Sequence, residues 1–210
     1  MLARVVESAL PEPLLRRARR AIARLGDERL RESYFTTFWL SRGAPPANAL
    51  EEAVRALEPL GRAPGAAGLE WWIGRSYTTQ VPIGFHFDQD VKSASRKLRH
   101  PLVSSVLFFN RVRGGQLAIT DQVPGPRGEP RPAQPGELQA IAPRANRYAI
   151  FPGHLLHGVL DARGQTPGAR KLPGPPGRLR ITLVVNYWEA RPTGVPAFAE
   201  SRAYRALRRR

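Results

Sequence analysis

Four histidines and no cysteine limit the metal chemistry that this 210-residue chain can carry. Without cysteine there is no disulfide, thiolate metal site or thiol nucleophile, so a metal must bind to imidazole nitrogens and carboxylate oxygens. His86 and Asp88 stand two residues apart in the segment IGFHFDQD. If this segment is a strand, both side chains lie on one face, and Phe85 and Phe87 pack on the other.

A second histidine-containing segment, FPGHLLHGV, lies much later in the chain, at residues 151–159. One histidine from this segment would complete a set of two imidazoles and one carboxylate. Such a facial triad leaves three positions of an octahedral metal open, which suits non-haem Fe(II). His154 and His157 can both supply the third ligand on spacing alone.

The segment RLRITLVVNYW at residues 178–188 predicts a strand with two different faces. One face is wholly apolar and needs a core or a helix layer to cover it; it comprises Leu179, Ile181, Leu183, Val185 and Tyr187. The other face begins with Arg178, Arg180 and Thr182. An inward-facing arginine is costly unless it meets an anion, and a guanidinium group matches a carboxylate in two parallel hydrogen bonds. The strand therefore predicts an anion site beside the metal.

Two helices are predicted before the β-rich region. Apolar residues at Leu14, Ala18, Ile22 and Leu25 recur at helical spacing, and arginines occupy much of the remaining surface. We assign these arginines to solvent. A second helix is predicted over 49–60, with Asn48 as N-cap and Glu51 completing a pattern that resembles a capping box.

From residue 68 the sequence pattern changes to short runs of β-branched and aromatic residues, which are typical of an antiparallel sandwich or barrel. These runs are residues 68–80, 83–88, 104–112, 116–120, 147–151 and 178–188. Two stretches rich in proline and glycine, residues 123–136 and 162–177, interrupt them. Since proline cannot donate to a sheet ladder, we expect both stretches to be excursions between strands.

The order of these motifs resembles the Fe(II)/2-oxoglutarate-dependent dioxygenase superfamily, and most closely its prolyl-4-hydroxylase-like branch. The resemblance covers roughly residues 70–190 and rests on HFD at 86–88, GGQL at 114–117, HGV at 157–159 and RITLVVNYW at 180–188. It implies a mostly β protein with N-terminal helices, whose core is a double-stranded β-helix, or jelly roll, packed by helices. It also implies Fe(II) bound by His86, Asp88 and His157, with His154 in a loop or beside the ligands.

The same resemblance implies 2-oxoglutarate as co-substrate, with its distal carboxylate gripped by an arginine of the last strand. Arg180 with Thr182 fits the short form of this signature, and Arg178 fits a longer form. The gap between His157 and either arginine is longer than is usual in the family. Tyr77 is a candidate donor to the co-substrate, and a half-buried sheet tyrosine without that role is at least as good an interpretation. The implied reaction is hydroxylation of an unidentified substrate with release of succinate and CO2.

Other polar and aromatic residues receive structural interpretations. Asp90 and Asp121 are expected on the surface or in turns, and His100, which precedes a proline, in a solvated loop. The tryptophans Trp71, Trp72 and Trp188 are expected in the core rather than as a substrate platform.

We predict one domain over 1–210, with a helical part at 1–65, an oxygenase core at 66–195 and a basic tail at 196–210. With 33 basic and 17 acidic residues the net charge is +16, which leaves nucleic acid open as a partner without favouring it. The expected partners are 2-oxoglutarate, O2 and a small-molecule or protein substrate. Two other functions compete: a cupin-like, non-oxidative metal protein and a basic nucleic-acid-binding protein. No stretch is apolar enough to span a membrane, so a cytoplasmic protein is expected.

Overall fold

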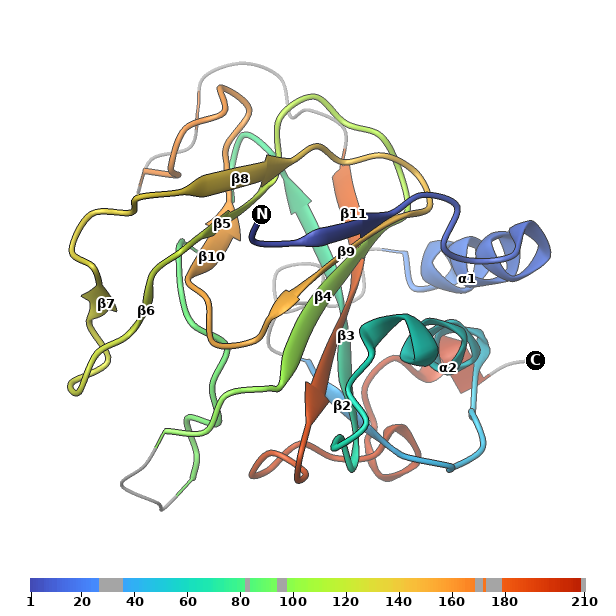
Figure 1. The fold of residues 1–210 in the computed structure, drawn as a ribbon. Helices are drawn as coiled ribbons and strands as arrows, with labels where there is room; N and C mark the ends of the chain where they lie inside the picture. Colours follow the sequence, from blue (N-terminus) through green and yellow to red (C-terminus); the bar gives the residue numbers. More distant parts are fainter. Residues whose placement is uncertain (27–35, 82–83, 94–97, 169–171, 173–178, 209–210) are drawn as a thin grey trace.

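The computed structural model describes residues 1–26, 36–81, 84–93, 98–168, 172 and 179–208, and shows two antiparallel sheets with helices on one side (Figure 1). The larger sheet has the spatial order β1 (Arg4–Val6), β9 (Arg147–Pro152), β4 (Val103–Phe108), β11 (Leu179–Trp188), β3 (Gly68–Tyr77) and β2 (Phe38–Ser41). The smaller sheet has the order β10 (His157–Val159), β5 (Leu117–Thr120) and β8 (Leu138–Ile141). This mostly antiparallel β architecture with few helices fits a jelly roll.

Helix α1 (Glu12–Arg24) and helix α2 (Ala49–Gly61) lie close to their predicted positions. In α1 the buried residues include Leu15 rather than Leu14, so the apolar face is rotated slightly from the predicted one. Asn48 caps α2 as predicted, because its Oδ1 accepts from the backbone N–H groups of Leu50 and Glu51. The Glu51 carboxylate reaches back to the N–H of Ala47, one residue before the cap.

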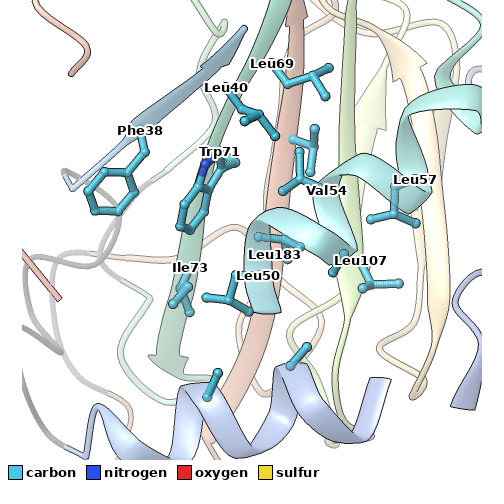
Figure 2. Packing of buried hydrophobic residues seen from close by; sticks show 14 of the residues in the cluster. Phe38, Leu40, Leu50, Val54, Leu57, Leu69, Trp71, Ile73, Leu107 and Leu183 are labelled. Carbon is cyan, nitrogen blue, oxygen red and sulfur yellow. The ribbon is translucent and has the colours of Figure 1, made fainter. Parts of the chain in front are cut away.

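The helices cover one face of the larger sheet and form the main hydrophobic core with it. Figure 2 shows Leu50, Val54 and Leu57 of α2 packed over Trp71, Ile73 and Leu183 of the central strands. These side chains are fully buried, and each such aliphatic side chain contributes roughly 1.5–3 kcal/mol through the water it no longer orders. This packing fixes β3 and β11, which carry part of the functional site on their other face.

The predicted two-faced strand is observed in β11. Leu183, Val185 and Tyr187 belong to the core under the helices, whereas Val184 belongs to a second core between the two sheets. Alternate residues of β4 divide in the same way, since Leu107 faces the helices and Val106 and Phe108 face the smaller sheet. The arginine-bearing face of β11 therefore points into the space between the sheets.

The N-terminal part contributes two edge strands that the sequence analysis does not predict. β1 pairs with β9, and β2 pairs with β3. They contain three and four residues, too few for a period-two pattern to be detected. Strand β8 was missed for the same reason.

The C-terminal residues, predicted as a basic tail, form short 3-10 helices at Phe198–Glu200 and Arg205–Arg208. Their apolar side chains Phe198, Tyr204 and Leu207 are buried in the main core. The Phe198 ring lies edge-on to Phe38 of β2, with centroids 5.3 Å apart. This segment therefore contributes to the packing of the helix side.

The first proline-rich excursion forms a separate hairpin of β6 (Val123–Pro124) and β7 (Pro130–Arg131), outside both larger sheets. Of the second excursion, the described part covers residues 162–168 and 172. Among the helices of the described ranges, none is long and apolar enough to cross a membrane.

Candidate metal centre

His86 and His157 lie opposite each other and pair through their backbones. The N–H of His86 donates to the carbonyl of His157 at 2.9 Å, and the reverse bond is 3.1 Å. This is an isolated antiparallel bridge at the free side of β10, and over the described residues 84–88 the predicted strand is wrong. These residues meet β10 at one residue pair, which is too little contact to form a ladder. Phe87 lines the cavity instead of packing away from it.

The three predicted ligands come together at this bridge. Asp88 Oδ1 lies 3.6 Å from His86 Nε2, and Asp88 Oδ2 lies 3.5 Å from His157 Nε2. One donor atom from each residue falls within 4.8 Å of the others. Two imidazoles and one carboxylate at this separation can surround a single divalent ion and leave coordination positions open.

Backbone and hydroxyl groups orient all three side chains. His86 Nδ1 lies 2.9 Å from the carbonyl of Gly84, and His157 Nδ1 lies 3.0 Å from the carbonyl of Leu155. A carbonyl only accepts, so each Nδ1 carries the proton and each Nε2 presents its lone pair to the centre. Ser104 donates from its hydroxyl to Asp88 Oδ2 at 2.7 Å.

The electrostatics keep the centre ready for a cation. Burial by itself raises the pKa of Asp88, but the neighbouring His157 and His86 and the Ser104 hydroxyl hold it well below its usual range. Burial and the charge of His86 lower the pKa of His157, against the pull of Asp88. Asp88 is therefore ionised and His157 neutral at pH 7, which are the protonation states that bind metals. Burial lowers the pKa of His86, but Asp88 and the Gly84 carbonyl outweigh it and raise that pKa, so a metal at His86 competes with a proton.

A steric constraint explains why residue 158, in the HGV motif, is glycine. A Cβ on Gly158 would lie 2.6 Å from the Phe85 ring, closer than real Cβ atoms come to a neighbour. Any larger residue here would displace Phe85, which stands directly before His86. Gly158 thus permits the backbone bridge between the two histidine segments.

The centre opens into a cavity of about 630 Å³ between the sheets. Its lining includes all three ligands together with Arg180, which is 2% exposed. Arg180 Nε donates to the carbonyl of Gly115 at 2.9 Å, and its guanidinium carbon lies 5.2 Å from the centre of the Phe108 ring. A buried cation of this kind favours a carboxylate ligand.

The glycine pair of GGQL shapes the pocket of Arg180. Gly115 has a φ of 66°, a conformation that side chains rarely adopt. A Cβ there would also meet the Arg180 side chain at 2.9 Å. Only glycine allows the backbone to approach and hold the arginine.

The other residues predicted to contact the co-substrate lie in different places. Thr182 is fully buried and lies 3.4 Å from Arg180 through its hydroxyl oxygen. Tyr77 pairs with Leu179, so it lies on the helix side of the sheet, and it is 38% exposed. This position directs Tyr77 away from the cavity and agrees with the alternative of a partly buried sheet tyrosine. Arg178 lies outside the described residues.

His154 lies exposed in a turn outside the ligand cluster, which agrees with its predicted loop position. Two other residues near the ligands differ from their predicted positions. His100 is half-buried rather than solvated, and its Nδ1 lies 2.7 Å from the carbonyl of Asp88. Asp90 is buried, and it accepts hydrogen bonds from Arg99 and Thr193.

The hydrogen bonds that Asp90 accepts hold the segment after Asp88 in place. Asp121 is only partly buried and accepts from the N–H of Gly136, as expected of a turn carboxylate.

The sequence analysis missed cavity residues on β3 and at the end of β11. Trp71 and Trp188 are buried as predicted and Trp72 is partly buried, but Trp72 and Trp188 also line the cavity. Glu70 and Asn186 also line it and pair across the strands. An acidic residue inside the apolar run GLEWWIG was the available signal, since a strand interior rarely carries a carboxylate without a reason.

Comparisons with known proteins establish the fold. No family model and no curated protein matches the chain. A prolyl-4-hydroxylase from Pseudomonas putida superposes with a TM-score of 0.50 at 20% identity, covering 90% of this chain and 93% of the other. HygX from Streptomyces hygroscopicus with iron bound gives a TM-score of 0.52 at 15% identity, covering 94% and 83%.

The form of HygX with nickel and 2-oxoglutarate bound gives a TM-score of 0.51 at 14% identity, covering 93% of this chain and 82% of the other. The chain therefore shares the fold of these oxygenase-type proteins. At the level of the fold, the resemblance inferred from the sequence is confirmed.

Proposed function

We propose that this protein is an Fe(II)- and 2-oxoglutarate-dependent oxygenase that hydroxylates an organic substrate and releases succinate and CO2. One observation carries the proposal: His86, Asp88 and His157 converge in a cavity that also contains a buried arginine. The shared fold supports it, because HygX has been observed with iron and with nickel and 2-oxoglutarate. The triad would also serve a cupin-like metal protein, so the buried arginine in the same cavity is what favours the oxygenase. Among the described residues, no comparable cluster favours nucleic-acid binding.

The residues of the cavity have separate tasks in this proposal. His86, Asp88 and His157 would hold Fe(II), which supplies the oxygen activation that protein side chains cannot perform. Ser104 and the two backbone carbonyls fix the ligands before metal binding, so no rearrangement is needed. Arg180 binds the distal carboxylate of 2-oxoglutarate, and Thr182 shares that contact.

The experiment is an anaerobic titration of the protein with Fe(II) and 2-oxoglutarate, followed by the visible absorption that forms when the co-substrate chelates the iron. Aerobic succinate formation is measured on the same samples. We expect both signals from the native chain and neither from Asp88→Ala, which lacks the only carboxylate of the triad.

Asp121→Asn is the matched control. Asp121 lies away from the cavity, and asparagine retains the oxygen that accepts from Gly136. This variant should behave as the native protein does. Normal iron binding and succinate formation by Asp88→Ala would show that the triad is assigned wrongly.

A further inference from the structure

Glu70 is a buried carboxylate on the cavity face of β3, at the opposite end of the site from Arg180. It is 9% exposed and pairs with Asn186 across β3 and β11. Arg180 stands six residues before Asn186 on β11, a separation of about 20 Å along an extended strand. The cavity therefore has a positive end and an acidic end, with the metal ligands also lining it.

The donors around Glu70 are neutral. Trp188 donates from Nε1 to Glu70 Oε2 at 3.0 Å, and the side chain of Thr37 also forms a hydrogen bond with the carboxylate. Over the described ranges, no lysine or arginine forms an ion pair with Glu70. A carboxylate offers about four acceptor sites, so two neutral donors leave part of its capacity unused.

This arrangement makes the ionisation of Glu70 costly. Burial, reinforced by the charges of Asp88 and Asp90, raises the pKa of Glu70 to about 7, although Thr37 and Trp188 oppose the shift. A buried carboxylate without a cation is expensive to ionise. A positive ligand would remove that cost.

The surroundings add further features that suit a cation. Asn186 is 1% exposed, and its Oδ1 has no hydrogen-bond partner within the described part of the chain. Because Asn186 faces Glu70 across the strands, two acceptors lie together. The aromatic side chains of Trp72, Phe87 and Trp188 also line the cavity, and aromatic faces attract cations.

We propose that this end of the cavity binds an organic cation, an ammonium or guanidinium group, with Glu70 as its charged partner. The two ends then bind groups of opposite sign: Arg180 a carboxylate and Glu70 a cation. Identification of the cation with part of the oxygenase substrate rests on the proposed function, whereas its binding to Glu70 does not.

The test uses the four tryptophan indole N–H signals in a ¹⁵N NMR spectrum of the full chain. Benzylammonium is the probe, and benzyl alcohol is its neutral analogue of similar size. At about pH 8, where Glu70 is ionised, benzylammonium should shift the Trp188 indole signal, because that N–H is bound to Glu70. Benzyl alcohol should shift it far less.

Glu70→Gln should weaken benzylammonium binding about tenfold or more, since a neutral amide replaces a charge-assisted partner. Glu51→Gln is the matched control: Glu51 is also buried and also accepts from a tryptophan indole, that of Trp71, but it lies outside the cavity. The signal of Trp39, whose indole donates to the Ser41 hydroxyl and to neither substituted carboxylate, reports whether each variant is folded.

Unchanged affinity in Glu70→Gln, or equal shifts by the alcohol, would overturn the proposal. The titration is run without added metal and repeated with Zn(II) and 2-oxoglutarate. If the oxygenase function were wrong, the iron and succinate experiments would fail while the cation binding to Glu70 persisted.

Discussion

The acidic end of the cavity should make the protein less stable as the pH rises, and Glu70→Gln should remove this effect. The pKa of Glu70 is raised from its ordinary 4.5 to about 7, first by burial and then by the charge of Asp88. The folded state therefore holds the proton more tightly than the unfolded state does. Its contribution to stability is complete below pH 4.5 and is lost as the pH rises through 7.

The size of the effect follows from the shift. At about 1.4 kcal/mol per pKa unit, the shift from 4.5 to about 7 amounts to about 3 kcal/mol of unfolding free energy. Glutamine cannot ionise, and its amide oxygen still accepts from Trp188. For a chain of this length, 3 kcal/mol corresponds to roughly 6–12 °C in melting temperature.

The assay is chemical denaturation of both proteins, with a chelator present, at pH 4.5 and at about pH 8. The stability of Glu70→Gln relative to the native chain should rise by about 3 kcal/mol between the two conditions. Glu189→Gln makes the same substitution at an exposed position just after β11 and should show no such rise. A stability difference for Glu70→Gln that does not change with pH would refute the reasoning.

Four further predictions concern the metal centre, the anion end and the register of the central strands. Ser104→Ala should weaken Fe(II) affinity about 10- to 100-fold in a metal titration, because it removes the hydroxyl that orients Asp88; unchanged affinity would count against that role. His157→Ala should abolish Fe(II) binding while His154→Ala retains it, and equal losses in the same titration would reassign the ligand. Arg180→Ala should weaken 2-oxoglutarate binding by about 2–5 kcal/mol in calorimetry, and lysine should restore it only in part. Tyr77→Phe should leave that affinity unchanged, and a comparable loss there would contradict the register of β3 and β11.

The features that the sequence could predict are those with a local signature. The alternation of β11 is a period-two pattern within a single strand, so its two faces were assigned correctly. His86 and Asp88 were paired by their spacing, and the later histidine segment by its motif. In each case a few adjacent residues contain the whole signal.

The features that escaped prediction depend on contacts between distant segments. Asp90 was expected on the surface because its sequence neighbours give no sign of its hydrogen-bond donor, Thr193, which lies about a hundred residues later. Glu70 is interpretable only beside Trp188 and Asn186, which lie more than a hundred residues later. Burial of a polar side chain is a property of the assembled fold, and local composition does not determine it.

The two faces of β11 should also be visible in the genetics of this protein. Leu183, Val185 and Tyr187 pack under the helices, so substitutions there would lower the amount of folded protein in a cell. Arg180, Asn186 and Trp188 line the cavity, so substitutions there would alter chemistry while much of the protein still accumulates. A saturation scan that records abundance and activity separately would therefore show the two phenotypes alternating over residues 185–188, and Asn186 and Trp188 could acquire new specificity without loss of the packing under the helices.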